Sequence, residues 1–198
     1  MKKQIAELVS LIFNPLFLII LVIILGIGKS LLSQTDAMLL TLATLFFNGF
    51  LSGCMLVYFS KRGIIIDDIV YNKKVRENRR FLLAWGSVIL FLECLAVYLL
   101  KKPEPLFAIL FSLFLLITAI FFINNHRKIS LHSSGITFFA LTVGFVFNKW
   151  FWLTLILIPL VCWSRLFLVR HTINQLLAGF FLSVVTITAV FYFFDLIF

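Results

Sequence analysis

Long apolar stretches limit what this chain can fold into more than any other feature of the sequence. A helix needs about 20 apolar residues to cross the hydrocarbon core of a bilayer. Two of the runs, 136–147 and 150–163, are short, and Asn148-Lys149 between them favours a hairpin. We therefore expect an all-α membrane helix bundle with seven transmembrane helices, or six if the two short runs form one bent unit. The apolar runs are residues 8–27, 38–59, 81–100, 106–123, 136–147, 150–163 and 176–194.

Composition agrees with one integral membrane domain over residues 1–198. Hydrophobic residues make up 63% of the chain and charged residues 13%, whereas a soluble domain is about half apolar and about a quarter charged. A net charge of +9 in a soluble protein would suggest a nucleic-acid partner. In a membrane protein, Lys and Arg instead mark the loops that flank the spans, so we expect no nucleic-acid partner. The three Cys residues lie in apolar runs without a CxxC motif, which predicts neither a disulfide nor a zinc site.

The basic residues are divided unevenly between the two membrane faces. With seven spans, 13 of the 17 Lys and Arg residues fall on the face that carries the N-terminus, together with all three His residues. The positive-inside rule would place this face in the cytoplasm, at the cell membrane. An anion-binding site would also raise the number of Lys and Arg residues on this face, however, so the sequence does not decide whether the face lies in the cytoplasm.

Two polar positions interrupt the apolar runs. Asn14-Pro15 lies inside the first run, which we interpret as a retained span rather than a signal peptide, and we expect a kink there. Glu93 lies inside the third run, where facing lipid would be costly. We expect Glu93 to form a contact between helices rather than to act in catalysis.

One polar patch combines residue types that suit phosphate chemistry. Arg165 follows Ser164, and His171 and Gln175 come six and ten residues after Arg165. On a helix, Gln175 would lie one turn after His171 and could face it. This arrangement is typical of a nucleophilic imidazole whose second ring nitrogen is held by a partner.

Two more patches on the same expected face carry related residues. Ser130 and His132 occur in Lys-Ile-Ser-Leu-His at residues 128–132. Lys73 and Arg80 are separated by six residues, and Arg76 and Arg79 between them could fill the same role. Guanidinium groups fit phosphate oxygens, and two His residues can divide the roles of nucleophile and acid.

Together the three patches resemble the signature motifs of the type-2 phosphatidic acid phosphatase superfamily, in particular a divergent bacterial branch, over about residues 60–190. The family motifs are Lys-x6-Arg-Pro, Pro-Ser-Gly-His and Ser-Arg-x5-His-x3-Asp. Here Phe81 replaces the Pro of the first motif, Ile129 and Leu131 replace the Pro and Gly of the second, and Gln175 stands at the Asp position of the third. Gln175 can accept a hydrogen bond but supplies no charge, which Asp67 or Asp68 could provide instead.

The resemblance implies a membrane phosphatase that removes a phosphate or diphosphate from a lipid, such as a phospholipid, a polyprenyl diphosphate or lipid A. His171 would attack phosphorus and form a phosphohistidine, His132 would protonate the leaving oxygen, and Gln175 would orient His171. No metal or other cofactor would be needed. The alternative is a non-catalytic membrane protein that binds or transports lipids and retains these residues. The residues that would hold the phosphoryl oxygens are Arg165, Lys73, Arg76, Arg79, Arg80 and Ser130.

Overall fold

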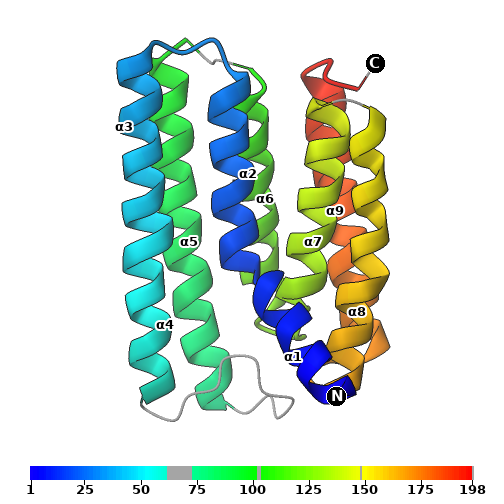
Figure 1. The fold of residues 1–198 in the computed structure, drawn as a ribbon. Coiled ribbons are helices and arrows are strands. Elements are labelled where there is room, and N and C mark those ends of the chain that lie inside the picture. Colours follow the sequence, from blue (N-terminus) through cyan, green and yellow to red (C-terminus); the bar gives the residue numbers. More distant parts are fainter. Residues whose placement is uncertain (62–72, 102–103, 148, 198) are drawn as a thin grey trace. The chain divides into compact units, whose positions relative to one another are not determined.

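The computed structural model describes residues 1–61, 73–101, 104–147 and 149–197, and within these ranges the secondary structure is helical throughout (Figure 1). This confirms the predicted all-α fold. The helices in chain order are α1 (Lys2–Ile12), α2 (Pro15–Lys29), α3 (Gln34–Thr44), the π-helix η1 (Leu45–Leu51), α4 (Ser52–Lys61), α5 (Lys73–Leu99), α6 (Leu106–Ile123), α7 (Leu131–Val146), the 3-10 helix η2 (Lys149–Ile156), α8 (Leu157–Phe167) and α9 (Ile173–Phe193).

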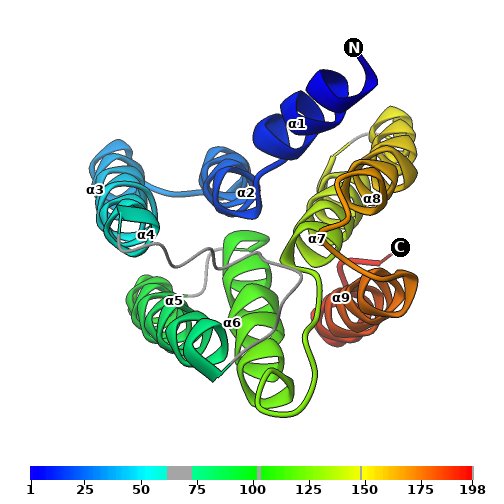
Figure 2. The same ribbon diagram turned by 90° about the horizontal axis from the view of Figure 1, so that it is seen from below.

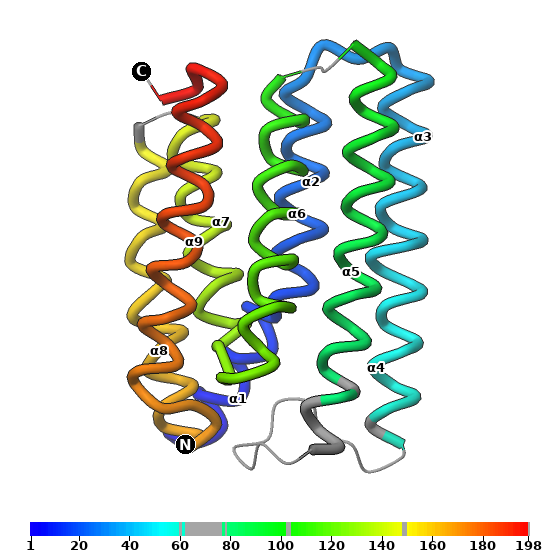
Figure 3. The backbone as a smooth tube through the Cα atoms, turned by 180° about the vertical axis from the view of Figure 1, so that it is seen from behind, coloured from blue at the N-terminus to red at the C-terminus, as the bar shows by residue number. Residues whose placement is uncertain are grey.

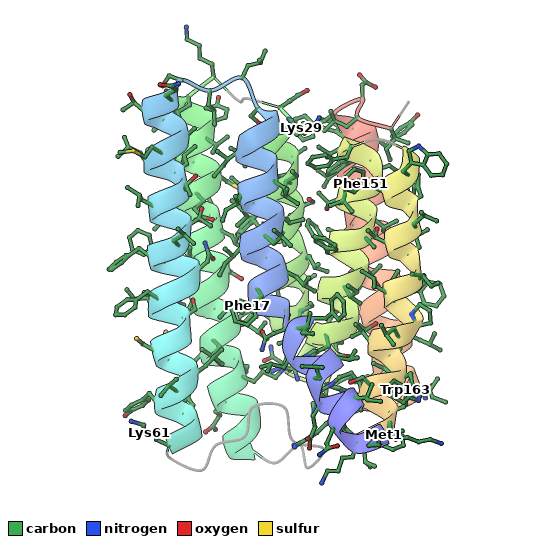
Figure 4. The ribbon with its side chains drawn as sticks, in the orientation of Figure 1. Met1, Phe17, Lys29, Lys61, Phe151 and Trp163 are labelled. Carbon is green, nitrogen blue, oxygen red and sulfur yellow. The ribbon has the colours of Figure 1, made fainter. Side chains whose placement is uncertain are left out.

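The chain divides into two compact units, and the expectation of one integral membrane domain stays a prediction. Unit 1 consists of residues 1–19 and 128–198, and unit 2 of residues 20–127. In unit 1, α7 packs against α8 and α9, while α1 packs on α8. Figure 3 shows α7, α8 and α9 side by side, and in Figure 4 Met1 lies at the same end of this unit as Trp163, with Phe151 at the other end. Unit 1 therefore joins the first helix of the chain to the last three.

Unit 2 is a second helical bundle. Its closest helix pair is α5 and α6, and α4 and η1 also contact α5. Glu93 on α5 lies inside this unit, where its Oε1 accepts hydrogen bonds from Asn48 Nδ2 at 2.8 Å and from Thr44 Oγ1 at 3.3 Å. All three side chains are buried. The expected contact of Glu93 with a neighbouring helix is confirmed.

The lengths of the helices limit how many of them can cross a bilayer. Five continuous helical stretches among the described residues are long and apolar enough to do so, and two of them, Gln34–Phe59 and Trp150–Phe167, combine adjacent helices. The bent pair of α1 and α2 raises the number to six. The expected span at 136–147 belongs to α7, which has 16 residues. Its rise of about 24 Å is shorter than a hydrocarbon core of about 30 Å. The hairpin interpretation of the two short runs is confirmed, because α7 ends at Val146, η2 begins at Lys149, and both η2 and α8 pack back against α7.

The predicted break at Asn14-Pro15 divides the first apolar run into two helices bent by 41°. Pro15 is the first residue of α2, the position where its missing N–H costs least. Asn14 precedes it, and the Oδ1 of Asn14 accepts a hydrogen bond from Leu16 N–H at 2.9 Å. α1 thus ends before the break, and α2 begins after it with its own N-terminal cap.

Candidate functional site

Two chain segments that are far apart in the sequence meet at one end of unit 1. Ser130 is the N-cap of α7, and its side chain accepts a hydrogen bond from Ser133 N–H. The backbone N–H of Ser130 donates to the carbonyl of Gln175 at 3.1 Å, and Lys128 Nζ donates to the carbonyl of Arg170 at 3.5 Å. The second and third predicted motifs are therefore neighbours, held together by one hydrogen bond between backbones and one from the side chain of Lys128.

A glycine that the sequence analysis did not single out permits this close approach. A Cβ atom on Gly179 of α9 would lie 2.7 Å from the carbonyl oxygen of Ser130 and 2.8 Å from Ser134 Oγ. Real Cβ atoms do not approach backbone oxygens so closely, and the Ser130 carbonyl has no flexible side chain to move away. Gly179 thus sets the distance between α9 and the turn that starts α7.

A strained turn connects Arg165 to His171. The backbone N–H of Arg170 donates to the carbonyl of Arg165, and that of Val169 donates to the carbonyl of Leu166. These bonds form the turn that commonly ends a helix, in which the residue after the cap is usually glycine. Here that residue is Val169 with φ 54°, a conformation that is costly for a β-branched side chain. Such strain is characteristic of functional sites, where the surrounding structure holds it in place.

The geometry at His171 determines which of its ring nitrogens carries the proton. The ring is 3% exposed, and its Nδ1 lies 3.0 Å from Gln175 Oε1. The same Oε1 accepts a hydrogen bond from the backbone N–H of Thr172 at 3.3 Å, as part of a capping box at the start of α9. A backbone N–H can only donate, so this atom of Gln175 is its oxygen and Nδ1 of His171 is the donor. In the neutral imidazole, Nε2 of His171 therefore carries the lone pair.

The predicted pairing of His171 with Gln175 is confirmed, but the predicted reason for it is wrong. His171 lies in the loop between α8 and α9 and not on a helix. Gln175 reaches His171 because the capping box turns its side chain back across the start of α9. The contact follows from the cap residues Thr172 and Gln175 rather than from helical spacing.

Arg165 and His132 meet at a residue that the sequence analysis missed. Arg165 Nη1 donates to Ser10 Oγ on α1 at 2.5 Å. Nε2 of His132 lies 3.3 Å from the carbonyl oxygen of Ser10 and 3.4 Å from its Oγ. The carbonyl can only accept, so Nε2 of His132 carries a proton. Ser10 lies in an apolar run more than 120 residues away, and its sequence context gives no signal of this contact.

The first predicted motif lies on a helix and not in a loop. α5 begins at Lys73, so its first turns carry Arg76, Arg79 and Arg80. Arg79 is buried, while Arg80 is exposed and its guanidinium lies 5.5 Å from the ring centre of Phe121 on α6. The side chains of Lys73 and Arg76 and the segment with Asp67 and Asp68 lie outside the described residues. All four basic residues belong to unit 2, so their predicted role beside His171 stays a prediction.

Among the described side chains, no three His, Cys, Asp or Glu residues gather in a group that could hold a metal ion, and the expectation of a metal-free site stays a prediction. No family model, curated protein or solved structure matches this chain. The resemblance to the phosphatase superfamily therefore depends on the motif residues alone.

Proposed function

We propose that this chain is a membrane-embedded phosphatase that hydrolyses a phosphate or diphosphate from a lipid through a phosphohistidine on His171. The observation that carries the proposal is the fixed tautomer of His171, in which Gln175 holds Nδ1–H and Nε2 bears the lone pair. An imidazole held in this way is a competent nucleophile at neutral pH. Arg165 and His132 are both buried and supply the other two groups that phosphoryl transfer requires.

The proposed reaction has two steps. In the first, Nε2 of His171 attacks phosphorus, the bond from phosphorus to the lipid oxygen breaks, and His132 in its imidazolium form gives its Nε2 proton to that oxygen. In the second, His132 accepts a proton from water, and the resulting oxygen nucleophile attacks phosphorus and releases phosphate and neutral His171. Arg165 holds the phosphoryl oxygens, whose charge is spread over the group in the transition state. Gln175 keeps the ring of His171 oriented throughout.

Apolar side chains around the loop support a lipid as the substrate. Four exposed apolar residues flank the segment that carries His171, namely Leu166, Phe167, Val169 and Ile173. Exposed apolar groups beside a polar site are typical of contact with a membrane or a lipid. A headgroup could thus reach Arg165 while the acyl or prenyl tails stay in the bilayer, which we infer to be the cell membrane.

The test is phosphate release from a panel of short-chain lipid phosphates that includes a phosphatidate, a phosphatidylglycerol phosphate, a polyprenyl diphosphate and a lipid A phosphate. The purified wild-type protein should release phosphate from at least one of them, and His171→Ala should not. His126→Ala is the matched control, because His126 is exposed and outside the proposed site. Equal release by the wild type and His171→Ala would instead favour a non-catalytic lipid-binding or transport protein.

A further inference from the structure

Helix α1 is held in unit 1 by two residues of the proposed reaction, Arg165 and His132, and by Ser164, which precedes Arg165. Ser164 Oγ donates to the carbonyl of Ala6 at 2.7 Å, and Arg165 Nη1 donates to Ser10 Oγ. His132 Nε2 lies 3.3 Å from the carbonyl oxygen of Ser10. Figure 2 shows α1 beside α8, the helix that carries Ser164 and Arg165. Two candidate site residues, Arg165 and His132, and the neighbouring Ser164 therefore bind the same helix.

These contacts place Ser10 where a phosphoryl oxygen that binds both Arg165 Nη1 and His132 Nε2 would lie. A guanidinium donates to a phosphate oxygen at about 2.7–2.9 Å, and Ser10 Oγ already occupies such an acceptor position beside Arg165. The carbonyl of Ser10 also points its partial negative charge at His132, where it would repel an anion. A phosphate group that binds Arg165 Nη1 and His132 Nε2 has to displace Ser10.

The sequence around α1 allows such a displacement without unfolding α2. α1 ends at Ile12, and α2 starts at Pro15 with its own cap from Asn14. Because proline has no backbone N–H, it cannot donate a helical hydrogen bond back to α1. Moving α1 about this break therefore leaves the hydrogen bonds of α2 intact.

The outward face of α1 favours a helix that stays at the membrane in both positions. Ile5, Leu8 and Leu11 form an exposed apolar stripe, and exposed Lys2 and Lys3 lie at the start of the helix. A short helix with an apolar face and basic residues is suited to the membrane interface. Lipid can cover this stripe whether or not the inward face contacts α8, so displacement does not expose it to water.

We propose, on the basis of the proposed function, that α1 is a hinged cover of the phosphate site, and that Ser10 occupies the place of a phosphoryl oxygen until a phosphate group displaces it. The resting site is closed, with Arg165 Nη1 and His132 Nε2 bound to the neutral acceptors of Ser10. Entry of the lipid phosphate exchanges these for charged oxygens, and α1 swings away from α8. The cover keeps a buried guanidinium partnered when no substrate is present.

Spin-label distances between α1 and α8 test this directly. The full-length protein, in lipid nanodiscs and with Cys54→Ser and Cys162→Ser, carries labels at Leu8→Cys and Phe167→Cys, both of which are exposed positions. Orthovanadate is the phosphate analogue, and its binding is measured separately by inhibition of phosphate release. We expect vanadate to add a population at longer distance, and Arg165→Gln in the same labelled protein to abolish this response.

The outcomes separate the cover from the proposed function. If vanadate inhibits phosphate release and the distance stays unchanged, α1 is not a cover, and the phosphatase proposal stands. If the protein releases no phosphate and vanadate leaves the distance unchanged, both proposals fail.

A substitution at Ser10 gives a second, kinetic test. Ser10→Ala removes the hydroxyl that competes for Arg165, so KM for a lipid phosphate should fall by about fivefold, the equivalent of one net hydrogen bond. kcat should change little. Leu11→Ala is the matched control, because Leu11 is on the exposed face of the same helix and its loss should leave KM unchanged. A rise in KM for Ser10→Ala would mean that Ser10 binds the phosphate itself, which would overturn the proposed cover.

Discussion

The hydrogen bond between His171 and Gln175 allows a quantitative prediction for Gln175→Leu, which keeps a similar volume but has no acceptor. The Nδ1–H of His171 is buried, and a buried donor without an acceptor costs about 1–3 kcal/mol. Thr172 is exposed, so water can replace the acceptor for its N–H. We expect the free energy of unfolding to fall by about 1–2 kcal/mol, most of it from the loss at His171.

The same loss should appear in catalysis, because the ring of His171 would no longer be fixed in the tautomer that exposes the lone pair of Nε2. A cost of about 1.4 kcal/mol in the transition state corresponds to about a tenfold lower kcat. KM should change less, since Arg165 still holds the phosphate. The assay is phosphate release from a short-chain lipid phosphate in detergent, with thermal unfolding measured in the same detergent.

Gln175→Glu is the matched variant, because it keeps the length and the acceptor and adds a negative charge. Charged acceptors form hydrogen bonds about twice as strong as neutral ones, and a carboxylate would stabilise the positive ring of the phosphohistidine. We expect kcat to rise severalfold above that of the wild type. If Gln175→Leu retains the kcat of the wild type, the reasoning about the tautomer is refuted, even if its unfolding temperature falls.

Three further substitutions test the geometry around the site. Val169→Gly relieves a positive φ and should raise the free energy of unfolding by about 1 kcal/mol, whereas Val169→Ala should not; equal thermal unfolding of the two would contradict the strain. Gly179→Ala places a Cβ 2.7 Å from the Ser130 carbonyl and should lower the free energy of unfolding, measured by chemical denaturation, by about 1–3 kcal/mol. An unchanged free energy of unfolding would mean that α9 can shift without cost. His132→Ala should slow release from an alkyl phosphate by about 100-fold or more and affect 4-nitrophenyl phosphate far less, since that leaving group needs no proton; similar losses for both substrates would argue against an acid role.

The general fold could be predicted from the sequence because most of the apolar runs are long enough to indicate a helix by themselves. The run at 106–123 matches α6, the run at 81–100 covers most of α5, and the break at Pro15 follows from the chemistry of one residue. The start of α5 was predicted too late, since polar residues from Lys73 onward continue the same helix. Polar residues show where a helix leaves the apolar layer of the membrane, but they do not show where the helix itself ends.

The site was predictable in its residue types and less so in its geometry. The spacing of Arg165, His171 and Gln175 pointed to the pair that the structure joins, although through a capping box. Ser10 could not be found, because no local pattern shows which distant helix a single hydroxyl will face. Gly179 was missed for a similar reason: its role depends on an approach to a carbonyl 49 residues earlier in the chain, which the printed sequence does not reveal.

The most direct test of the account is to trap phosphate on His171. Wild-type protein is mixed with a lipid phosphate carrying a radioactive phosphoryl group, quenched within milliseconds in alkali, digested and mapped. The account predicts a base-stable, acid-labile phosphate on the peptide that contains His171, and none in His171→Asn. Phosphate release without any such intermediate, or with the label on a different residue, would contradict it.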